Sequence, residues 1–127
     1  AGSKNVLELH GTIYKNHCIK CKKEYDAEYV FSSEDIPRCE CGSIIKPNVV
    51  LYGEMLPEDF VLAEKYISEC DMLIVAGTSL TVEPAASLIN YFRGKSLVII
   101  NNDETPYDKR ATLIINEDLT SVFKLLS

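Results

Sequence analysis

Two close pairs of cysteines are the residues of this sequence best suited to chemistry. Cys18 and Cys21 have two residues between them, and only one residue separates Cys39 from Cys41. Two tight turns, each presenting two sulfurs, supply the four thiolates that zinc takes at tetrahedral corners. Gly42 permits the sharp turn that the second pair requires. We therefore predict one structural zinc ion, because four protein ligands leave no position open for a substrate.

Two other interpretations of the cysteines are unligated thiols and a redox pair. Neither accounts for both pairs together. The fifth cysteine, Cys70, continues the apolar stripe of a predicted helix, so we expect it to be a small buried hydrophobic residue.

Composition indicates which kinds of partner and which cellular compartment suit this protein. The 127 residues carry a net charge of -6 and are 46% hydrophobic, which suits a protein with a core and argues against nucleic acid as the main partner. The apolar runs are much shorter than the roughly 18 residues of a membrane span. An odd number of clustered cysteines and a small, polar start without a secretory leader predict a reducing, cytoplasmic location.

The order of apolar patterns predicts an α/β fold. Residues 4–11 read as a strand or short loop that presents His10, and residues 14–47 form the cysteine ribbon. After residue 54, helical and strand-like periods alternate in three repeats, which is typical of a doubly wound parallel sheet. We predict a partial Rossmann-like domain, formed by residues 1–12 and 48–127, with a small zinc-ribbon module inserted at residues 13–47.

Spacing and cap residues place the elements of these repeats. Strands are expected over residues 71–77, 96–100 and 111–115, the first of them fully buried. A first helix is expected to begin at Pro57, a second to span residues 84–93 with Gly94 as its left-handed cap, and a third to be capped by Asp118 and to run through residue 126. The buried stripes expected on the first two helices are Phe60, Ala63, Ile67 and Cys70, and Ala85, Leu88, Ile89 and Phe92.

Motifs along the whole chain also resemble those of a known family. They are, in order, Glu8-Leu9-His10-Gly11, the two cysteine pairs, Lys46-Pro47-Asn48-Val49-Val50-Leu51-Tyr52-Gly53-Glu54, and Gly77-Thr78-Ser79-Leu80. The chain resembles the C-terminal half of a sirtuin, an NAD-dependent protein lysine deacylase that releases nicotinamide and O-acyl-ADP-ribose. Any one motif alone is weak, and together they are specific.

The resemblance implies a base, a substrate strand and a cofactor edge. His10 is the implied base for a ribose hydroxyl of NAD, a role that suits histidine because it ordinarily titrates near neutral pH. An acyl-lysine peptide would add to an edge formed by Val49, Val50, Leu51, Tyr52, Gly53 and Glu54, with Val50 and Tyr52 walling the acyl tunnel. The implied NAD contacts are Gly77, Thr78, Ser79, Asn101, Asn102, Asp103 and Leu119. Position supports these contacts, because ligands collect where strands of doubly wound sheets end.

Plainer interpretations remain for these residues. His10 also fits a histidine bonded to a backbone carbonyl at a strand end, residues 49–54 fit an apolar strand before a glycine turn, and Asn101 and Asn102 fit an ordinary loop. His17 lies beside a zinc cysteine and lacks the motif, so we expect it at the surface or in contact with a zinc ligand.

Two departures from the sirtuin pattern matter. The second cysteine pair is spaced by one residue where many members have two, which a changed turn can absorb. No Gly-rich phosphate loop occurs in this sequence. We therefore expect a fragment that lacks the N-terminal NAD-binding half, supplied in the parent chain, and that does not deacylate alone.

Two alternatives to an enzyme stay open. One is a zinc-ribbon binding module for nucleic acid, although the ribbon is slightly acidic where such modules are usually basic. The other is a non-catalytic regulatory or interaction protein whose exposed sheet edge pairs with another chain. Oligomerisation measurements distinguish these from a fragment that needs its N-terminal half.

Overall fold

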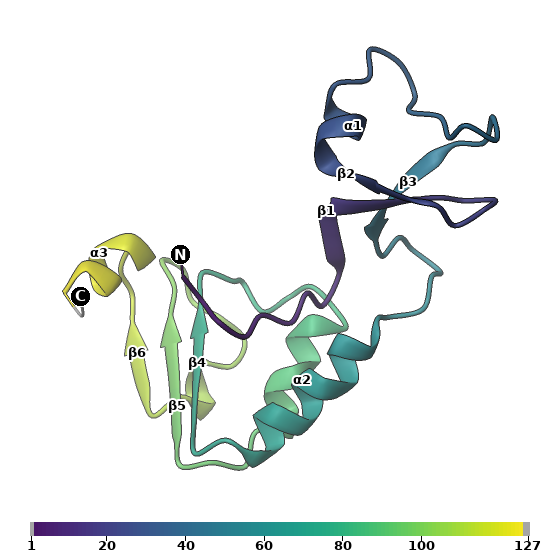
Figure 1. Cartoon of the computed structure of the whole chain (residues 1–127). Coiled ribbons are helices and arrows are strands. Elements are labelled where there is room, and N and C mark those ends of the chain that lie inside the picture. Colours follow the sequence, from purple (N-terminus) through teal and green to yellow (C-terminus); the bar gives the residue numbers. More distant parts are fainter. Residues whose placement is uncertain (1, 126–127) are drawn as a thin grey trace. The chain divides into compact units, whose positions relative to one another are not determined.

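The computed structural model describes residues 2–125 and divides the chain into two compact units, Ala1–Phe60 and Val61–Ser127 (Figure 1). An antiparallel sheet of three strands forms the first unit, and a parallel sheet of three strands forms the second. Helix α2 (Glu58–Glu69) contains the boundary between them. Among residues 2–125, no helix is both long enough and apolar enough to cross a membrane.

The first unit is built around strand β1 (Gly11–Cys18), which lies between β2 (Glu24–Asp26) and β3 (Ile45–Val49). A short helix, α1 (Ala27–Phe31), follows β2 and begins at Asp26, whose carboxylate accepts a hydrogen bond of 2.8 Å from the N–H of Tyr29. The buried cluster of this unit consists of Cys18, Cys39 and Ile45, with Tyr25 and Val30 packed against it. Two of the three buried residues are cysteines, so apolar packing alone gives this unit little stability.

The segment before β1 is a short loop, which was one of its two predicted forms, and not a strand. Residues 4–10 form no strand, and pairing with β3 begins at Gly11. Gly11 has a φ of +75°, and a Cβ there would lie 1.9 Å from the carbonyl oxygen of Asn48. Only glycine allows the start of β1 to approach β3 this closely.

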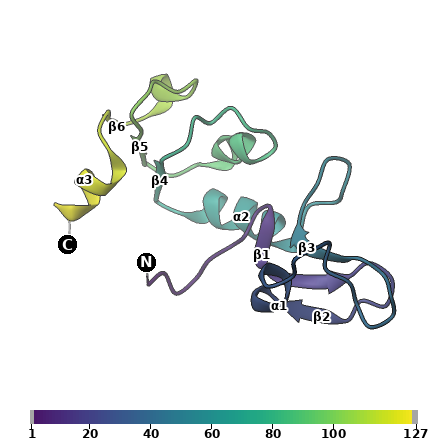
Figure 2. The same ribbon diagram turned by 90° about the horizontal axis from the view of Figure 1, so that it is seen from above.

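The second unit confirms the predicted parallel α/β pattern. Strands β4 (Met72–Ala76), β5 (Ser96–Ile100) and β6 (Leu113–Ile115) lie side by side in that order (Figures 1 and 2). The connections carry the 3-10 helices η1 (Ala85–Tyr91) and η2 (Asp108–Arg110), and α3 (Leu119–Lys124) follows β6. The core of this unit is a cluster of Leu80, Ile89, Phe92, Leu97 and Ile99.

The prediction that the first parallel strand is fully buried is wrong. Met72 and Ile74 on β4 are 55% and 49% exposed, whereas Leu73 and Val75 pack against the core cluster. Successive side chains of a strand point to opposite faces of the sheet. The run of apolar letters therefore hid an alternation between a packed face and an exposed one.

The predicted second helix differs in type and in its end. It is a 3-10 helix. Of the predicted stripe, Leu88 and Ile89 are buried, as is Phe92 directly after the helix, whereas Ala85 is only half-buried and its neighbour Ala86 is buried instead. Gly94 has no left-handed φ, so the predicted cap is also wrong. Glycine is needed there for space, since a Cβ would lie 2.4 Å from the carbonyl oxygen of Cys70 and 2.5 Å from that of Asp71.

The other elements follow the predictions with small shifts. Phe60 and Ala63 of α2 are buried, and Ile67 of α2 packs against the core cluster of the second unit, as does Cys70 directly after the helix. Strand β6 begins two residues later than expected. Asp118 caps α3 by accepting a hydrogen bond of 2.9 Å from the N–H of Ser121, and the predicted end at residue 126 lies outside the described residues.

Candidate zinc centre and candidate active site

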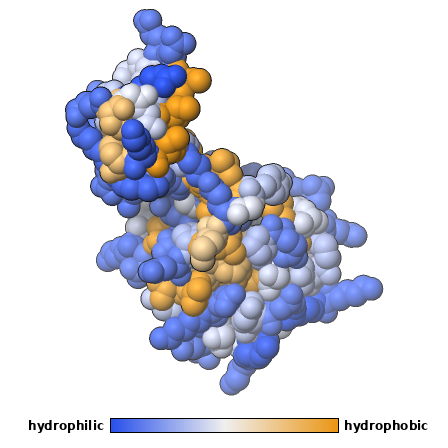
Figure 3. All heavy atoms as spheres, turned by 90° about the vertical axis from the view of Figure 1, so that its right-hand side faces the viewer, coloured by the Kyte–Doolittle hydropathy of each residue, from blue (hydrophilic) through white to orange (hydrophobic). Residues whose placement is uncertain are grey.

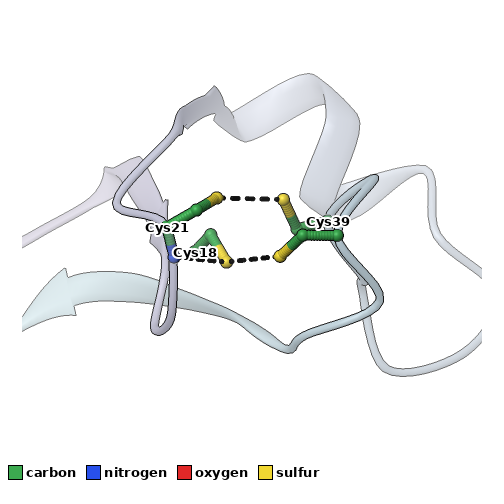
Figure 4. Close-up of side chains that lie close together, drawn as sticks. Cys18, Cys21 and Cys39 are labelled. Atoms are coloured by element: carbon green, nitrogen blue, oxygen red, sulfur yellow. Dashed lines mark hydrogen bonds between the residues drawn. The ribbon is translucent and has the colours of Figure 1, made fainter.

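The four predicted zinc ligands lie together in the first unit. The Sγ atoms of Cys18 and Cys41 are 3.5 Å apart, those of Cys21 and Cys39 are 3.4 Å apart, and all four lie within 4.8 Å of one another (Figure 4). A tetrahedral ion with zinc–sulfur bonds of about 2.3 Å requires sulfurs about 3.8 Å apart. The observed arrangement fits one zinc ion held by four thiolates.

Two tight turns present these sulfurs. Cys18 is the last residue of β1. The turn that follows is closed by a 3.1 Å hydrogen bond from the N–H of Lys22 to the carbonyl oxygen of Cys18. In the second turn the N–H of Gly42 donates to the carbonyl oxygen of Cys39 over 2.8 Å, and Gly42 has a φ of +81°. The single residue between Cys39 and Cys41 is thus accommodated by a left-handed glycine directly after the pair.

The electrostatics of the cluster also favour a bound cation. The pKa of Cys18 is lowered to about 6. The largest cause is the hydrogen bond from the N–H of Cys21; burial raises the pKa, and the N–H of Lys20 lowers it further. The N–H of Lys23 is the largest single influence on Cys21 and lowers its pKa, but the sulfurs of Cys39 and Cys18 raise it to about 11. Neighbouring thiolates thus oppose one another's ionisation, and a divalent cation removes that opposition.

The predicted base, His10, is exposed and its backbone is fixed against the predicted substrate segment. It lies in a turn directly before β1, where the N–H of Gly11 donates to the carbonyl oxygen of Glu8 over 2.8 Å. The carbonyl oxygen of His10 accepts a hydrogen bond of 3.0 Å from the N–H of Val50. Residues 40 positions apart in the sequence are therefore neighbours within one compact unit.

Residues 49–54 do not form the extended strand that the resemblance implied. Strand β3 ends at Val49, and a turn follows in which the N–H of Glu54 donates to the carbonyl oxygen of Leu51 over 3.0 Å. Gly53 has a φ of +83°, which turns the chain back before an extended edge can continue. Leu51 is 54% exposed, and Tyr52 is fully exposed. The segment is thus a turn with an apolar, exposed tip.

Two contacts around this segment, one of Lys46 and one between His17 and Asn48, were not predicted from the sequence. Lys46 and Glu54 form an ion pair of 2.7 Å across the turn. The Nδ1 atom of His17 is hydrogen-bonded to the Oδ1 atom of Asn48 on β3. Opposite charges on both sides of the apolar segment were the one signal in the sequence that pointed to the ion pair.

The predicted NAD residues lie where the parallel strands of the second unit end. The N–H of Gly77, after β4, donates to the carbonyl oxygen of Ile100 over 3.0 Å, and that of Asn101, after β5, donates to Ile115 over 3.1 Å. A Cβ on Gly77 would lie 3.3 Å from the side chain of Leu119, at the start of α3. Gly77, Asn101 and Leu119 are therefore gathered at one edge of the sheet.

The other predicted NAD residues border the same strand ends. Thr78 and Ser79 are exposed, and their hydroxyls bond locally, to the N–H of Leu80 over 3.2 Å and to the hydroxyl of Thr81 over 2.7 Å. Asn102 and Asp103 are exposed, and the side chain of Asn101 donates to the carbonyl oxygen of Asp103 over 2.9 Å. This edge is the usual position of a ligand in a parallel α/β sheet.

Comparison with known proteins identifies the family. A model of the Sir2 family matches residues 1–84. The chain belongs to the Sir2 family. An NAD-dependent protein deacetylase of Clostridium acetobutylicum is 52% identical to this sirtuin chain over 127 residues, 98% of the chain. Another of Clostridium tetani is 48% identical over 125 residues, 96% of the chain.

Solved structures of Sir2 proteins match the fold of this sirtuin chain. A Sir2 structure in complex with the inhibitor EX-527, 2'-O-acetyl-ADP-ribose and a deacetylated p53 peptide matches 98% of the chain with a TM-score of 0.90 at 41% identity. A complex of Sir2 with a p53 peptide and NAD+ matches with a TM-score of 0.89 at the same identity. The predicted resemblance and the α/β fold class are confirmed.

The sirtuin chain spans about half the length of the curated relatives that it matches. It covers 52% of the Clostridium acetobutylicum protein and 51% of the Clostridium tetani protein. Its share of the two solved chains is 56% and 55%.

Proposed function

We propose that this chain is the part of an NAD-dependent protein lysine deacylase that carries the catalytic histidine and the zinc ribbon. The reaction transfers an acyl group from lysine to ADP-ribose and releases nicotinamide and O-acyl-ADP-ribose. One observation carries the proposal: the hydrogen bond between the backbones of His10 and Val50 joins the candidate base to the candidate substrate segment. The deacetylase names of the relatives support it.

In this proposal the residues of the first unit bind the acylated peptide and move one proton. NAD, when bound, supplies the ribose carbon that accepts the acyl oxygen. The imidazole of His10 takes the proton from a ribose hydroxyl, and its exposure leaves the ring accessible to that group. Backbone groups of residues 49–54 hold the peptide, while Val50 and Tyr52 contact the acyl chain. The exposed apolar tip of the turn supports this role, because an exposed apolar patch often marks a binding site.

Residues of the second unit would hold NAD. Gly77, Asn101 and Leu119 lie together at the ends of the parallel strands, where small residues and backbone N–H groups suit a ribose or phosphate. Thr78, Ser79, Asn102 and Asp103 border the same edge. Gly77 suits the role best, since a larger side chain would press on Leu119.

The zinc ion would hold the ribbon and take no part in the reaction, because its four ligands are all protein sulfurs. We further propose that residues 13–47 form a ribbon module inserted into an NAD-binding domain of residues 1–12 and 48–127. A reducing, cytoplasmic location is part of this proposal, and it suits five cysteines that form no disulfide. Since the chain spans about half of its relatives, we expect activity only from a protein that also supplies the remaining half.

The test compares the chain with a whole protein that contains it. Both are incubated with NAD and an acetyl-lysine peptide, and nicotinamide release is measured. We expect turnover by the whole protein and none by the chain. His10→Ala should reduce turnover by at least a hundredfold, since general bases contribute about 10²–10⁴. His17→Gln, at the other histidine of the sequence, is the matched control and should retain activity. Undiminished turnover in His10→Ala removes His10 from its role, and an inactive whole protein favours a non-catalytic zinc-ribbon binding or interaction module.

A further inference from the structure

An ion pair closes the turn that carries the candidate substrate residues. Lys46 lies on β3 and Glu54 at the far end of the turn, and the Nζ atom of Lys46 is 2.7 Å from the Oε2 atom of Glu54. The same Nζ donates to the carbonyl oxygen of Val49 over 3.0 Å. The same Oε2 accepts a hydrogen bond of 2.9 Å from the N–H of Leu51. Each partner of the ion pair therefore also holds a backbone group of the segment.

These contacts fix the backbone on both sides of Val50. Lys46 holds the carbonyl group before Val50, Glu54 holds the N–H after it, and the N–H of Val50 itself bonds to the carbonyl oxygen of His10. Three consecutive residues are thus anchored at the point where the segment meets the candidate base. A shift of the turn would move the substrate contacts relative to His10.

The tip of the turn needs such an anchor. Tyr52 is fully exposed, Met55 is 93% exposed and Leu51 is 54% exposed, so these side chains contribute little packing that would hold the turn in place. Figure 3 shows that apolar side chains do reach the surface of the molecule. Segments with few buried contacts open readily. Backbone hydrogen bonds from charged side chains restrain such a segment while they leave its apolar tip open to a ligand.

Another ion pair among the described residues lacks these features. Lys23 and Glu40 are 2.6 Å apart, but their side chains are 48% and 80% exposed, against 24% and 43% for Lys46 and Glu54. Lys23 and Glu40 bond to each other and form no hydrogen bond with residues 49–54 among the described residues. An exposed pair of this kind usually contributes little to stability. Because Lys23 has the same charge and also pairs with a glutamate but holds no backbone group of residues 49–54, Lys23→Met serves as the control substitution.

We propose that Lys46 is a positioning residue for the acylated peptide: through Glu54 and the carbonyl group of Val49, it holds residues 49–54 in place beside His10. This inference rests on the proposed deacylase function. It assigns Lys46 no contact with the reacting atoms.

The test uses the whole protein that contains this chain, with NAD and an acetyl-lysine peptide as substrates. Lys46→Met should raise the KM for the peptide at least fivefold, while kcat and the KM for NAD change less than twofold. Lys46→Arg, which keeps the charge and the donors, should stay within twofold of the original protein in all three constants. Lys23→Met should do the same. An unchanged peptide KM in Lys46→Met, or equal impairment in Lys46→Arg, overturns the proposal.

Hydrogen exchange separates this inference from the proposed function. In Lys46→Met, the Leu51 amide should exchange at least tenfold faster, whereas it should keep its rate in Lys23→Met. Glu54→Gln provides a second variant with the same expected direction if Lys46→Met folds poorly. If the whole protein shows no deacylation, faster exchange still supports the anchoring by Lys46 while the deacylase function fails. Unchanged exchange in both variants overturns the anchoring itself.

Discussion

Replacement of Gly11 by alanine tests whether the loop of His10 depends on its close approach to β3. The carbonyl oxygen of Asn48 lies 1.9 Å from the position of a Cβ on Gly11, and the carbonyl carbon lies 2.9 Å from it. Both neighbours are backbone atoms, so no side-chain rotation relieves the contact. Gly11→Ala must therefore separate the loop from β3.

The expected cost has two parts. A non-glycine residue at positive φ costs about 1–2 kcal/mol. Separation of the two segments also breaks the hydrogen bond from Val50 to His10 and strains that from Gly11 to Glu8, each worth about 1 kcal/mol. We expect Gly11→Ala to lower the free energy of unfolding of the first unit by about 3–4 kcal/mol.

Gly42→Ala is the matched control for this substitution. Gly42 has a similar φ of +81°, but no atom lies within 4 Å of its Cβ position. It should therefore lose only the conformational part, about 1–2 kcal/mol. Urea unfolding of the zinc-bound chain measures both variants, and hydrogen exchange of the Val50 amide reports the broken contact. Equal destabilisation of the two variants, or unchanged protection of Val50 in Gly11→Ala, would refute the reasoning.

Two further predictions concern the zinc ion and the second unit. Metal analysis should find close to one zinc per chain. Cys39→Ser should lose both the zinc and the fold of the ribbon, whereas Cys70→Ser should keep both. A ribbon that stays folded after zinc is removed by a chelator contradicts the predicted site. Gly94→Ala should destabilise the second unit by about 1–3 kcal/mol through overpacking against the carbonyl groups of Cys70 and Asp71. Faster exchange of the Ser96 amide, which donates to Asp71 over 3.2 Å, should accompany that loss, and a rate equal to that of the original chain would count against it.

Features that depend on neighbouring residues were predicted well from the sequence. The spacing of the cysteines within each pair fixes the two turns, and the structure brings the four sulfurs together as expected. Apolar periodicity located α2 and the three parallel strands, and Asp118 marked the start of α3. His10 was proposed as the base from its motif alone, since an exposed histidine has no local signal of function.

Contacts between distant parts of the chain were decided only by the tertiary structure. The sequence alone does not distinguish the surroundings of Gly11 and Gly42, yet of these two only Gly11 has a Cβ position in contact with another strand. Strand β4 was predicted to be fully buried, because a run of apolar residues does not show which face of the sheet each one occupies. Strand β3 was expected to continue beyond Val49, where the structure has a turn. The pairing of Lys46 with Glu54 also arises from that turn. Each of these outcomes depends on which segments pack together in space, and spacing along the chain does not determine that.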